Sequence, residues 1–284
     1  CADGSLSSNS IEALQYGSVT RARVTDRTFS LRATLYGSAV AGAESTASSL
    51  NSAVYGDHSV NSAGFFAQKT FKPAAGLELT PAARYDRSGT YDGRVSPEFS
   101  AVYSPDGRWK LSAAAGRAFQ APTYADLYNP WAAPAPGLKP ETSANVSAAA
   151  RYGSPSGWYA SLGGYYSDIK DRIALDPLTW AAANLDRGFN SGLEAGAGWR
   201  AGGLALSASY TRARAMVRRA GETYRLLNFT PRDRYSLSAS LPTPAALLEI
   251  TGRSASAQYT GRGRSGLRLP EYWVFGLAAS RSFG

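Results

Sequence analysis

The chain has 284 residues, and its 29 glycines, 17 tyrosines and 6 tryptophans favour an all-β fold rich in turns. Its 30 basic residues exceed its 21 acidic ones, but they are scattered along the chain, which argues against nucleic-acid binding. One cysteine and one histidine exclude an internal disulfide framework, a Cys-based zinc site and a Cys–His nucleophile pair. No apolar run approaches the roughly 20 residues of a membrane-spanning helix.

Short polar connections and longer ones alternate along the chain. The short ones are "TDR" (25–27), "PAAG" (73–76), "SPDG" (104–107), "GSPSG" (153–157), "RAGG" (200–203) and "PTPAA" (242–246), and the longer ones are expected at 37–61, 87–94, 119–141, 167–187, 213–231 and 260–270. Membrane β-barrels have short turns at one end and long loops at the other, whereas soluble β-sandwiches have no reason to alternate. We therefore expect about thirteen antiparallel strands of about 9–13 residues between residues 11 and 283, forming a transmembrane β-barrel.

The expected strands alternate between apolar and small polar residues. In residues 235–241, Tyr235, Leu237, Ala239 and Leu241 share one face, and serines occupy the other. Lipid outside and a wet lumen inside would produce this pattern, although a half-buried soluble sheet would also do so. Arg117 and Arg281 have the parity of the lipid-facing aromatics, so we expect both near strand ends.

Several motifs resemble one family in composition and order. They include "GFFAQKTF" (64–71), "AFQAPTYADLY" (118–128), "GLKPETS" (137–143), "RGFNSGLEAG" (187–196), "NFTPRDRYSLSASL" (228–241) and "LPEYWVFGLAASRSF" (269–283). Together they resemble the β-barrel of TonB-dependent outer-membrane receptors, with the vitamin B12 and siderophore branch most similar. Gln120 departs from the basic residue usual in the family, and "ANVSAAA" lacks a Glu often found after "LKPETS".

The resemblance also implies that family segments lie beyond this chain. Family receptors carry an N-terminal plug domain that contacts TonB, and their barrels have about 22 strands. We therefore expect residues 1–284 to be a single barrel domain without a plug, truncated at both ends. An open sheet with unpaired edges near residues 11–23 and 271–283 should result.

By this resemblance, the intact protein takes up an iron–siderophore complex or cobalamin through the outer membrane of a Gram-negative cell, with energy from TonB acting on the plug. The resemblance implies neither enzymatic activity nor a cofactor or bound metal, and the partners would be the ligand, TonB and outer-membrane lipid. A passive porin-like channel is the main alternative. An autotransporter or secretion barrel and a β-rich surface adhesin are two further classes.

Ligand contacts are expected in long outer loops, where aromatic side chains supply rigid amphipathic surface. The candidates are Tyr91, Tyr124, Asp126, Tyr128, Asn129, Trp131 and Trp180. By family analogy, charged lumen residues would hold the plug, and these are Arg32, Glu78, Arg84, Glu98, Lys110 and Arg151. Tyr124 and Tyr128 could instead pack the loop or join an aromatic belt, and the charges could simply line a wet interior.

Overall fold

The computed structural model describes residues 2–13, 22–35, 37–131, 137–154, 156–175, 181–219 and 221–281. Most of them are in strands, because Gly-rich turns separate runs of alternating side chains. The elements are β1 (Ala2–Ala13), β2 (Ala22–Leu35), β3 (Ala39–Ser52), β4 (Gly56–Lys69), β5 (Phe71–Ala74), β6 (Leu77–Ser88), β7 (Tyr91–Tyr103), β8 (Trp109–Gln120), α1 (Tyr124–Leu127), β9 (Glu141–Gly153), β10 (Trp158–Leu175), β11 (Ala182–Ala201), β12 (Leu204–Arg219), β13 (Arg225–Leu226), β14 (Asp233–Pro242), β15 (Leu247–Ala255), β16 (Gln258–Tyr259), η1 (Arg262–Arg264), β17 (Arg268–Leu269) and β18 (Tyr272–Ser280).

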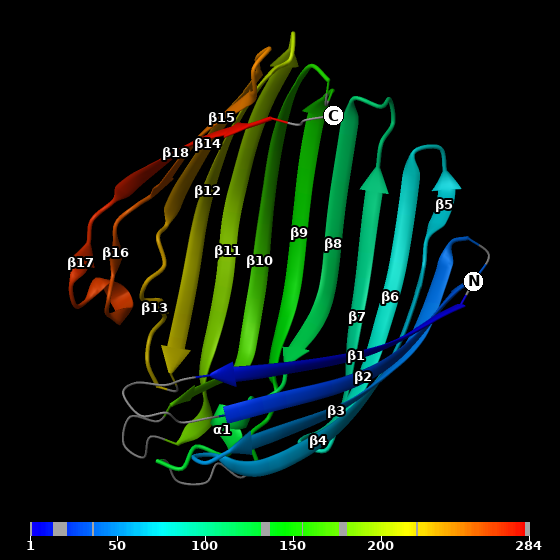
Figure 1. Ribbon diagram of the computed structural model, residues 1–284, viewed down its shortest axis with the longest axis vertical. Helices are drawn as coiled ribbons and strands as arrows, with labels where there is room; N and C mark the ends of the chain where they lie inside the picture. Colours follow the sequence, from blue (N-terminus) through cyan, green and yellow to red (C-terminus); the bar gives the residue numbers. More distant parts are fainter. Residues whose placement is uncertain are drawn as a thin grey trace.

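The strands form one curved antiparallel sheet, as predicted. Each long strand pairs with its neighbours along the chain, β5 and β13 add short pairs to β6 and β12, and β16 and β17 form a separate small hairpin. The sheet curves around an open interior, with β1 and β18 as its two edges (Figure 1).

The continuous path holds fourteen strands among the described residues, close to the roughly thirteen predicted. The first edge also lies earlier than expected, because residues 2–13 already pair with β2.

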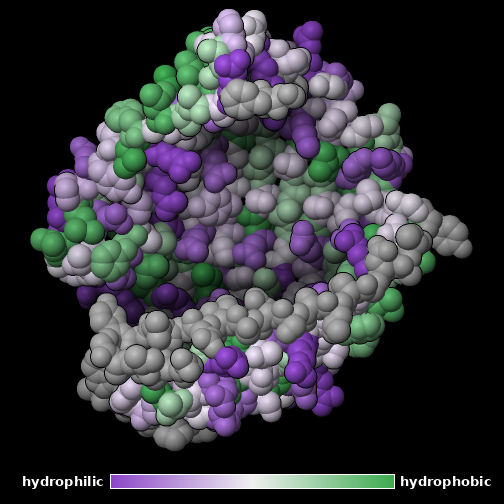
Figure 2. All heavy atoms as spheres, in the orientation of Figure 1, coloured by the Kyte–Doolittle hydropathy of each residue, from purple (hydrophilic) through white to green (hydrophobic). Residues whose placement is uncertain are grey.

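Strand register divides the side chains between two faces. Large apolar residues such as Phe65, Val95 and Leu193 are exposed on one face, which we call the outward face. Small and polar residues of the opposite parity occupy the concave face, where Ser207 pairs with Ser238 and Ser238 with Thr251. The space-filling view shows a hollow whose visible wall is largely polar, with scattered apolar patches (Figure 2).

The predicted short turns lie at one end of the sheet, which we call the short-turn end. Leu77 pairs with Tyr103, Tyr103 with Leu111 and Trp109 with Tyr152, so the turns that precede β6 and follow β7 and β9 share this end. We call the opposite end the long-loop end.

The "SPDG" turn is locked by its own side chain and backbone. Gly107 adopts a φ of 69°, which is accessible to glycine at little cost. Asp106 Oδ1 accepts the N–H of Trp109 at 2.8 Å and that of Arg108 at 3.0 Å. These backbone donors, that of Trp109 foremost, hold the pKa of Asp106 below its ordinary value.

Two predicted connections in the first quarter of the chain are wrong. β2 runs through "TDR" without a turn, and most of the expected loop at 37–61 is occupied by β3 and the first part of β4. The connection expected at 87–94 shrinks to residues 89–90. The long-loop end therefore also carries two short turns, at 53–55 and at 89–90.

Strands also extend further than predicted in the second half. β10 reaches Leu175, β11 begins at Ala182 and β12 reaches Arg219, so strands occupy much of the expected loops at 167–187 and 213–231. Arg117 lies three residues before the end of β8, and Arg281 directly follows β18, as expected for outward-facing arginines. Within the part of the chain that is described, no helix has the length and apolar character needed to cross a membrane.

Candidate ligand-binding site and concave surface

The connection between β8 and β9 begins with one capped helical turn. Thr123 caps α1, and its backbone N–H and hydroxyl donate to Asp126 Oδ2 at 2.8 and 2.6 Å. The backbone N–H of Asp126 donates back to Thr123 Oγ1 at 3.3 Å. This reciprocal capping box satisfies groups that a helix start leaves open. Asp126, predicted to contact ligand, thus uses its carboxylate within its own loop.

The same connection packs its aromatic rings against the turn between β3 and β4. The rings of Tyr128 and His58 are stacked with their centroids 3.4 Å apart, and Tyr124 stacks on Tyr128 at 6.0 Å. The ring of Trp131 meets that of Tyr55 edge-on at 6.1 Å. We call these five residues the aromatic cluster.

The aromatic cluster keeps accessible surface and polar tips. Trp131 is 69% exposed, while the hydroxyl of Tyr124 is buried without a hydrogen-bond partner among the described residues. Asn129 Oδ1 accepts the N–H of Trp131 at 3.1 Å and so shapes the loop beneath the indole. His58 Nε2 lies 2.7 Å from the carbonyl oxygen of Tyr55, which fixes the imidazole below Tyr128.

The second arm of the connection is tied to β10 and β11. Asn184 Nδ2 donates to the carbonyl oxygens of Lys139 and Asp171, at 2.8 and 2.6 Å, and Asn184 Oδ1 accepts the N–H of Lys139 at 2.8 Å. Glu141 Oε1 accepts the N–H of Ile173 at 2.8 Å. The "LKPE" motif is therefore an anchor for this arm, and Asn184 is a partner that the sequence pattern did not single out.

One predicted aromatic ligand residue, Tyr91, does not join the aromatic cluster. Tyr91 opens β7 and packs edge-on against Phe119 at 5.3 Å, on the outward face, as residues of an aromatic belt do. Trp180 lies outside the described residues. The structure therefore brings together Tyr124, Tyr128 and Trp131, and adds Tyr55 and His58, which lie where the sequence predicted an unstructured connection.

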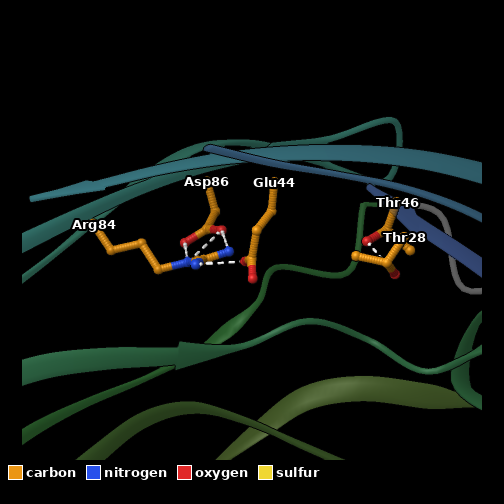
Figure 3. A network of polar contacts seen from close by, with 5 residues as sticks. All are labelled: Thr28, Glu44, Thr46, Arg84 and Asp86. Carbon is orange, nitrogen blue, oxygen red and sulfur yellow. Dashed lines mark hydrogen bonds and ion pairs between the residues drawn. The ribbon is translucent and has the colours of Figure 1, made fainter. Parts of the chain in front are cut away.

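An ion-pair network crosses the concave face from β3 to β6. Arg84 Nη1 lies 2.7 Å from Glu44 Oε2, and its Nε donates to both carboxylate oxygens of Asp86 at 2.8 and 2.9 Å. Glu44 pairs with Gly64, and Gly64 with Asp86, so the three positions form one row across the strands. The side chains extend from the ribbon into the interior, beside the hydrogen-bonded hydroxyls of Thr28 and Thr46 (Figure 3).

Register places all six predicted lumen charges on this one face. Arg32 connects to Arg84 through the cross-strand pairs Arg32–Gly42, Gly42–Phe66 and Phe66–Arg84.

Four further charged residues face the same side by register, namely Glu98, Lys110, Glu78 and Arg151. Glu98 pairs with Gly116 and Lys110 with Arg151. Glu78 contacts Lys72 at 2.7 Å, and the guanidinium of Arg151 lies over the ring of Tyr159 at 4.0 Å. The face is thus a wet surface of partly exposed charges, and a plug contact at these residues remains a prediction.

The chemistry available at both surfaces is recognition through rings and charges. Among the described residues, no three His, Cys, Asp or Glu side chains are grouped as they would be around a metal ion. The aromatic cluster offers ring faces and a few polar atoms, which suits the binding of a bulky, partly aromatic or macrocyclic ligand.

Comparison with known proteins finds a family model that matches nearly the whole chain and relatives that match parts of it. The family model described as TonB dependent receptor-like, beta-barrel, matches residues 3–283. The chain is 28% identical over 153 residues to the iron-regulated outer membrane virulence protein of Vibrio cholerae serotype O1, a match that covers 46% of this chain and 24% of that protein. It is 33% identical over 140 residues to the vitamin B12 transporter BtuB of Photobacterium profundum, covering 45% of this chain and 22% of the relative.

Solved structures share the fold at low sequence identity. A ferric enterobactin receptor from Pseudomonas aeruginosa matches with a TM-score of 0.74 and 20% identity, covering 97% of this chain and 50% of that one. The FrpB iron transporter from Neisseria meningitidis matches with a TM-score of 0.74 and 16% identity, covering 91% and 48%. The chain therefore spans about half the length of these solved structures.

Proposed function

Because the chain belongs to the family of TonB-dependent receptor β-barrels, we propose that it forms the barrel wall of an outer-membrane receptor that takes up a scarce nutrient complex. The proposed ligand is an iron–siderophore complex or cobalamin, and the energy comes from TonB acting through a plug domain. The relatives named for iron regulation, iron transport and vitamin B12 transport support this ligand class. The proposed location is the outer membrane of a Gram-negative cell, and uptake requires no bond to be made or broken.

The observation that carries the proposal is the aromatic cluster at the long-loop end. Its rings come from two places in the chain. Tyr55 lies in the turn between β3 and β4, and His58 lies at the start of β4. The other three rings lie in the connection between β8 and β9. Rigid rings bind with little loss of side-chain entropy, and the loop around them is held by the capping box and by Asn184. Such a preorganised patch suits capture of a large ligand from dilute solution.

The charged side chains on the concave face support the proposed action of TonB through a plug domain. Arg84 and Glu44 remain partly exposed, and an ion pair in such surroundings contributes about 0–1 kcal/mol. A plug held by many weak polar contacts of this kind could be released by mechanical pull without unfolding the barrel.

The aromatic cluster can be tested in the full-length receptor with Tyr124→Ala combined with Trp131→Ala. We expect affinity for the ferric siderophore or cobalamin to fall by about tenfold or more, because buried aromatic anchors dominate binding energy. Outer-membrane insertion, read as heat-modifiable migration on a gel, should be unchanged. The matched control is Tyr103→Ala with Trp158→Ala, two exposed rings at the short-turn end.

Unchanged uptake and affinity in the Tyr124/Trp131 variant would show that the cluster only packs the loop. Liposome swelling with the full-length protein separates the receptor from the porin-like alternative. A plugged receptor should not pass sugars, so free sugar permeation would contradict the proposal.

A further inference from the structure

An apolar groove runs along the outward face between β11 and β18. It encloses about 530 Å³, and its walls include Trp199, Leu206, Leu237, Ile250 and Phe275. Ala197, Ala208, Ala239 and Gly252 form its floor, because their small side chains leave room between the larger ones. Its volume and apolar lining suit a hydrocarbon chain.

A row of stacked rings borders the groove on the side of the long-loop end. Tyr210 stacks on Tyr235 at 4.9 Å, and Tyr235 on Trp273 at 6.3 Å. On its own strand, each ring is two residues from a groove residue, on the side of the long-loop end. The groove residues concerned are Ala208, Leu237 and Phe275. The hydroxyl of Tyr210 donates to Asp233 Oδ1 at 2.6 Å, so the row presents a polar edge away from the groove.

Beyond this row lies a second cavity of about 270 Å³, lined by four arginines. These are Arg212, Arg232, Arg264 and Arg268, and the carboxylates at its wall are Asp233 and Glu271. The cavity lies by β13, β16 and β17, which are grouped at the left of Figure 1. We call it the arginine pocket.

The arginine pocket is built to receive a negative charge. The Nε of Arg232 is buried and has no hydrogen-bond partner among the described residues, while its backbone N–H donates to Ser256 Oγ at 3.0 Å. Arg264 has a φ of 68°, a strained conformation for a residue with a side chain. Asp233 accepts from Tyr210 and lies 3.9 Å from Arg212. Because four guanidinium groups line the pocket and Asp233 and Glu271 are its two carboxylates, positive charge is in excess.

The apolar groove, the ring row and the arginine pocket follow one another along the sheet. Their order matches that of the acyl chain, the interfacial region and the phosphate of a lipid. Ala208 and Arg212 are four residues apart on β12, which is about 13 Å at the rise of a strand. Interfacial tyrosine and tryptophan rings lie at headgroup level, and guanidinium groups bind phosphate through paired N–H donors.

We propose that this surface binds one phosphate-bearing anionic lipid, with an acyl chain in the apolar groove and the phosphate in the arginine pocket. The inference rests on the proposed membrane location but not on nutrient uptake. A bound lipid would clamp β12, β14 and the β16–β17 hairpin together on the outward face.

The test is native mass spectrometry of the full-length receptor purified in detergent, with dioleoyl phosphatidic acid or dioleoyl phosphatidylcholine added at equal concentration. We expect the phosphatidic acid adduct to predominate. Arg232→Gln with Arg268→Gln should lower its retention at least tenfold, whereas Arg253→Gln, on the concave face of β15, should not. Heat-modifiable migration reports whether each variant is folded.

A second variant, Ala208→Trp, fills the groove and leaves the arginines in place. It should lower retention of the dioleoyl lipid but not of dihexanoyl phosphatidic acid, and it decides the question if the arginine variant does not fold. Equal retention of both dioleoyl lipids, or retention unchanged in the folded variants, would overturn the inference. So would displacement of the lipid by inorganic phosphate at the same concentration, because the site would then recognise free phosphate. Lipid retention is read without uptake, so failure of the proposed transport function would be seen separately.

Discussion

Gly64 determines how the ion-pair network on the concave face is built. A Cβ at this position would lie 2.5 Å from Arg84 Nη2 and 2.6 Å from Asp86 Oδ1, closer than such atoms can approach. The missing side chain on β4 is therefore what allows the Arg84–Asp86 pair of β6 to fold back toward Glu44 on β3.

We predict that Gly64→Ala separates this pair and lowers the free energy of unfolding by about 1 kcal/mol, after allowance for the partial exposure of the charges. Denaturant unfolding of the full-length receptor in detergent would measure the change. Gly89→Ala is the matched control, because a Cβ there meets no atom within 4 Å and should change stability by less than about 0.5 kcal/mol. Equal losses in both variants would mean that the network contributes nothing specific.

Single residues also show where sequence reasoning reached its limit. Alternation was enough to place Arg84 on the concave face and beside Asp86 on its own strand, but its partner Glu44 lies 40 residues earlier in the chain and meets it only through strand register. Asp126 resembled a ligand contact because it lies among aromatics, yet the spacing Thr123–Asp126 is also that of a capping box. The lone His58 gave no signal by itself, because only folding brings it beneath Tyr128.

At the scale of elements, the connection between β8 and β9 is a loop held at both arms. We predict that Asn184→Ala frees the second arm, because it removes three hydrogen bonds to Lys139 and Asp171 at once. Amides of residues 137–141 should then exchange hydrogen at least tenfold faster, while those of β10 and β11 keep their protection.

Hydrogen exchange followed by mass spectrometry measures both regions in one experiment. Asn145→Ala is the control, since the Asn145 amide contacts Ser143 on its own strand at 3.0 Å. Exchange that is unchanged in 137–141 would show that Pro140 and Glu141 anchor the arm without Asn184.

The strand segments that sequence reasoning missed lack the pattern that identified the others. From residue 73 onward the turns at the short-turn end were predicted correctly, because Pro and Gly separate strands that carry large residues on one face. β3, by contrast, is "AVAGAESTASSLNS", with small or polar residues on both faces and therefore no period of two. "TDR" combines turn-forming residues, yet pairing with β1 and β3 on both sides keeps it in β2.

At the scale of the whole molecule, the described residues place apolar bulk on the outside of the sheet. The buried apolar residues among them are few and mostly small, namely Leu50, Ala182, Val217 and Ala255, whereas Phe275 and Leu277 are more than 70% exposed. A water-soluble protein of this length would bury far more. The outward face therefore needs an apolar surrounding to contribute to stability, and the concave face does not.

Two neighbouring residues at the middle of β9 face these two different surroundings. Val146 is outward and 53% exposed, paired with Ala115 and Tyr166, while Ser147 is concave and paired with Ala114 and Tyr165. We predict that Val146→Arg lowers the free energy of unfolding in phospholipid vesicles by about 2–4 kcal/mol, the cost of arginine at a bilayer midplane. Ser147→Arg should cost less than about 1 kcal/mol, because its guanidinium remains in water. Both variants introduce the same side chain one residue apart, so the change in net charge is the same in the two proteins. Equal costs, or a larger cost for Ser147→Arg, would contradict the assignment of lipid to the outward face and with it the proposed membrane location.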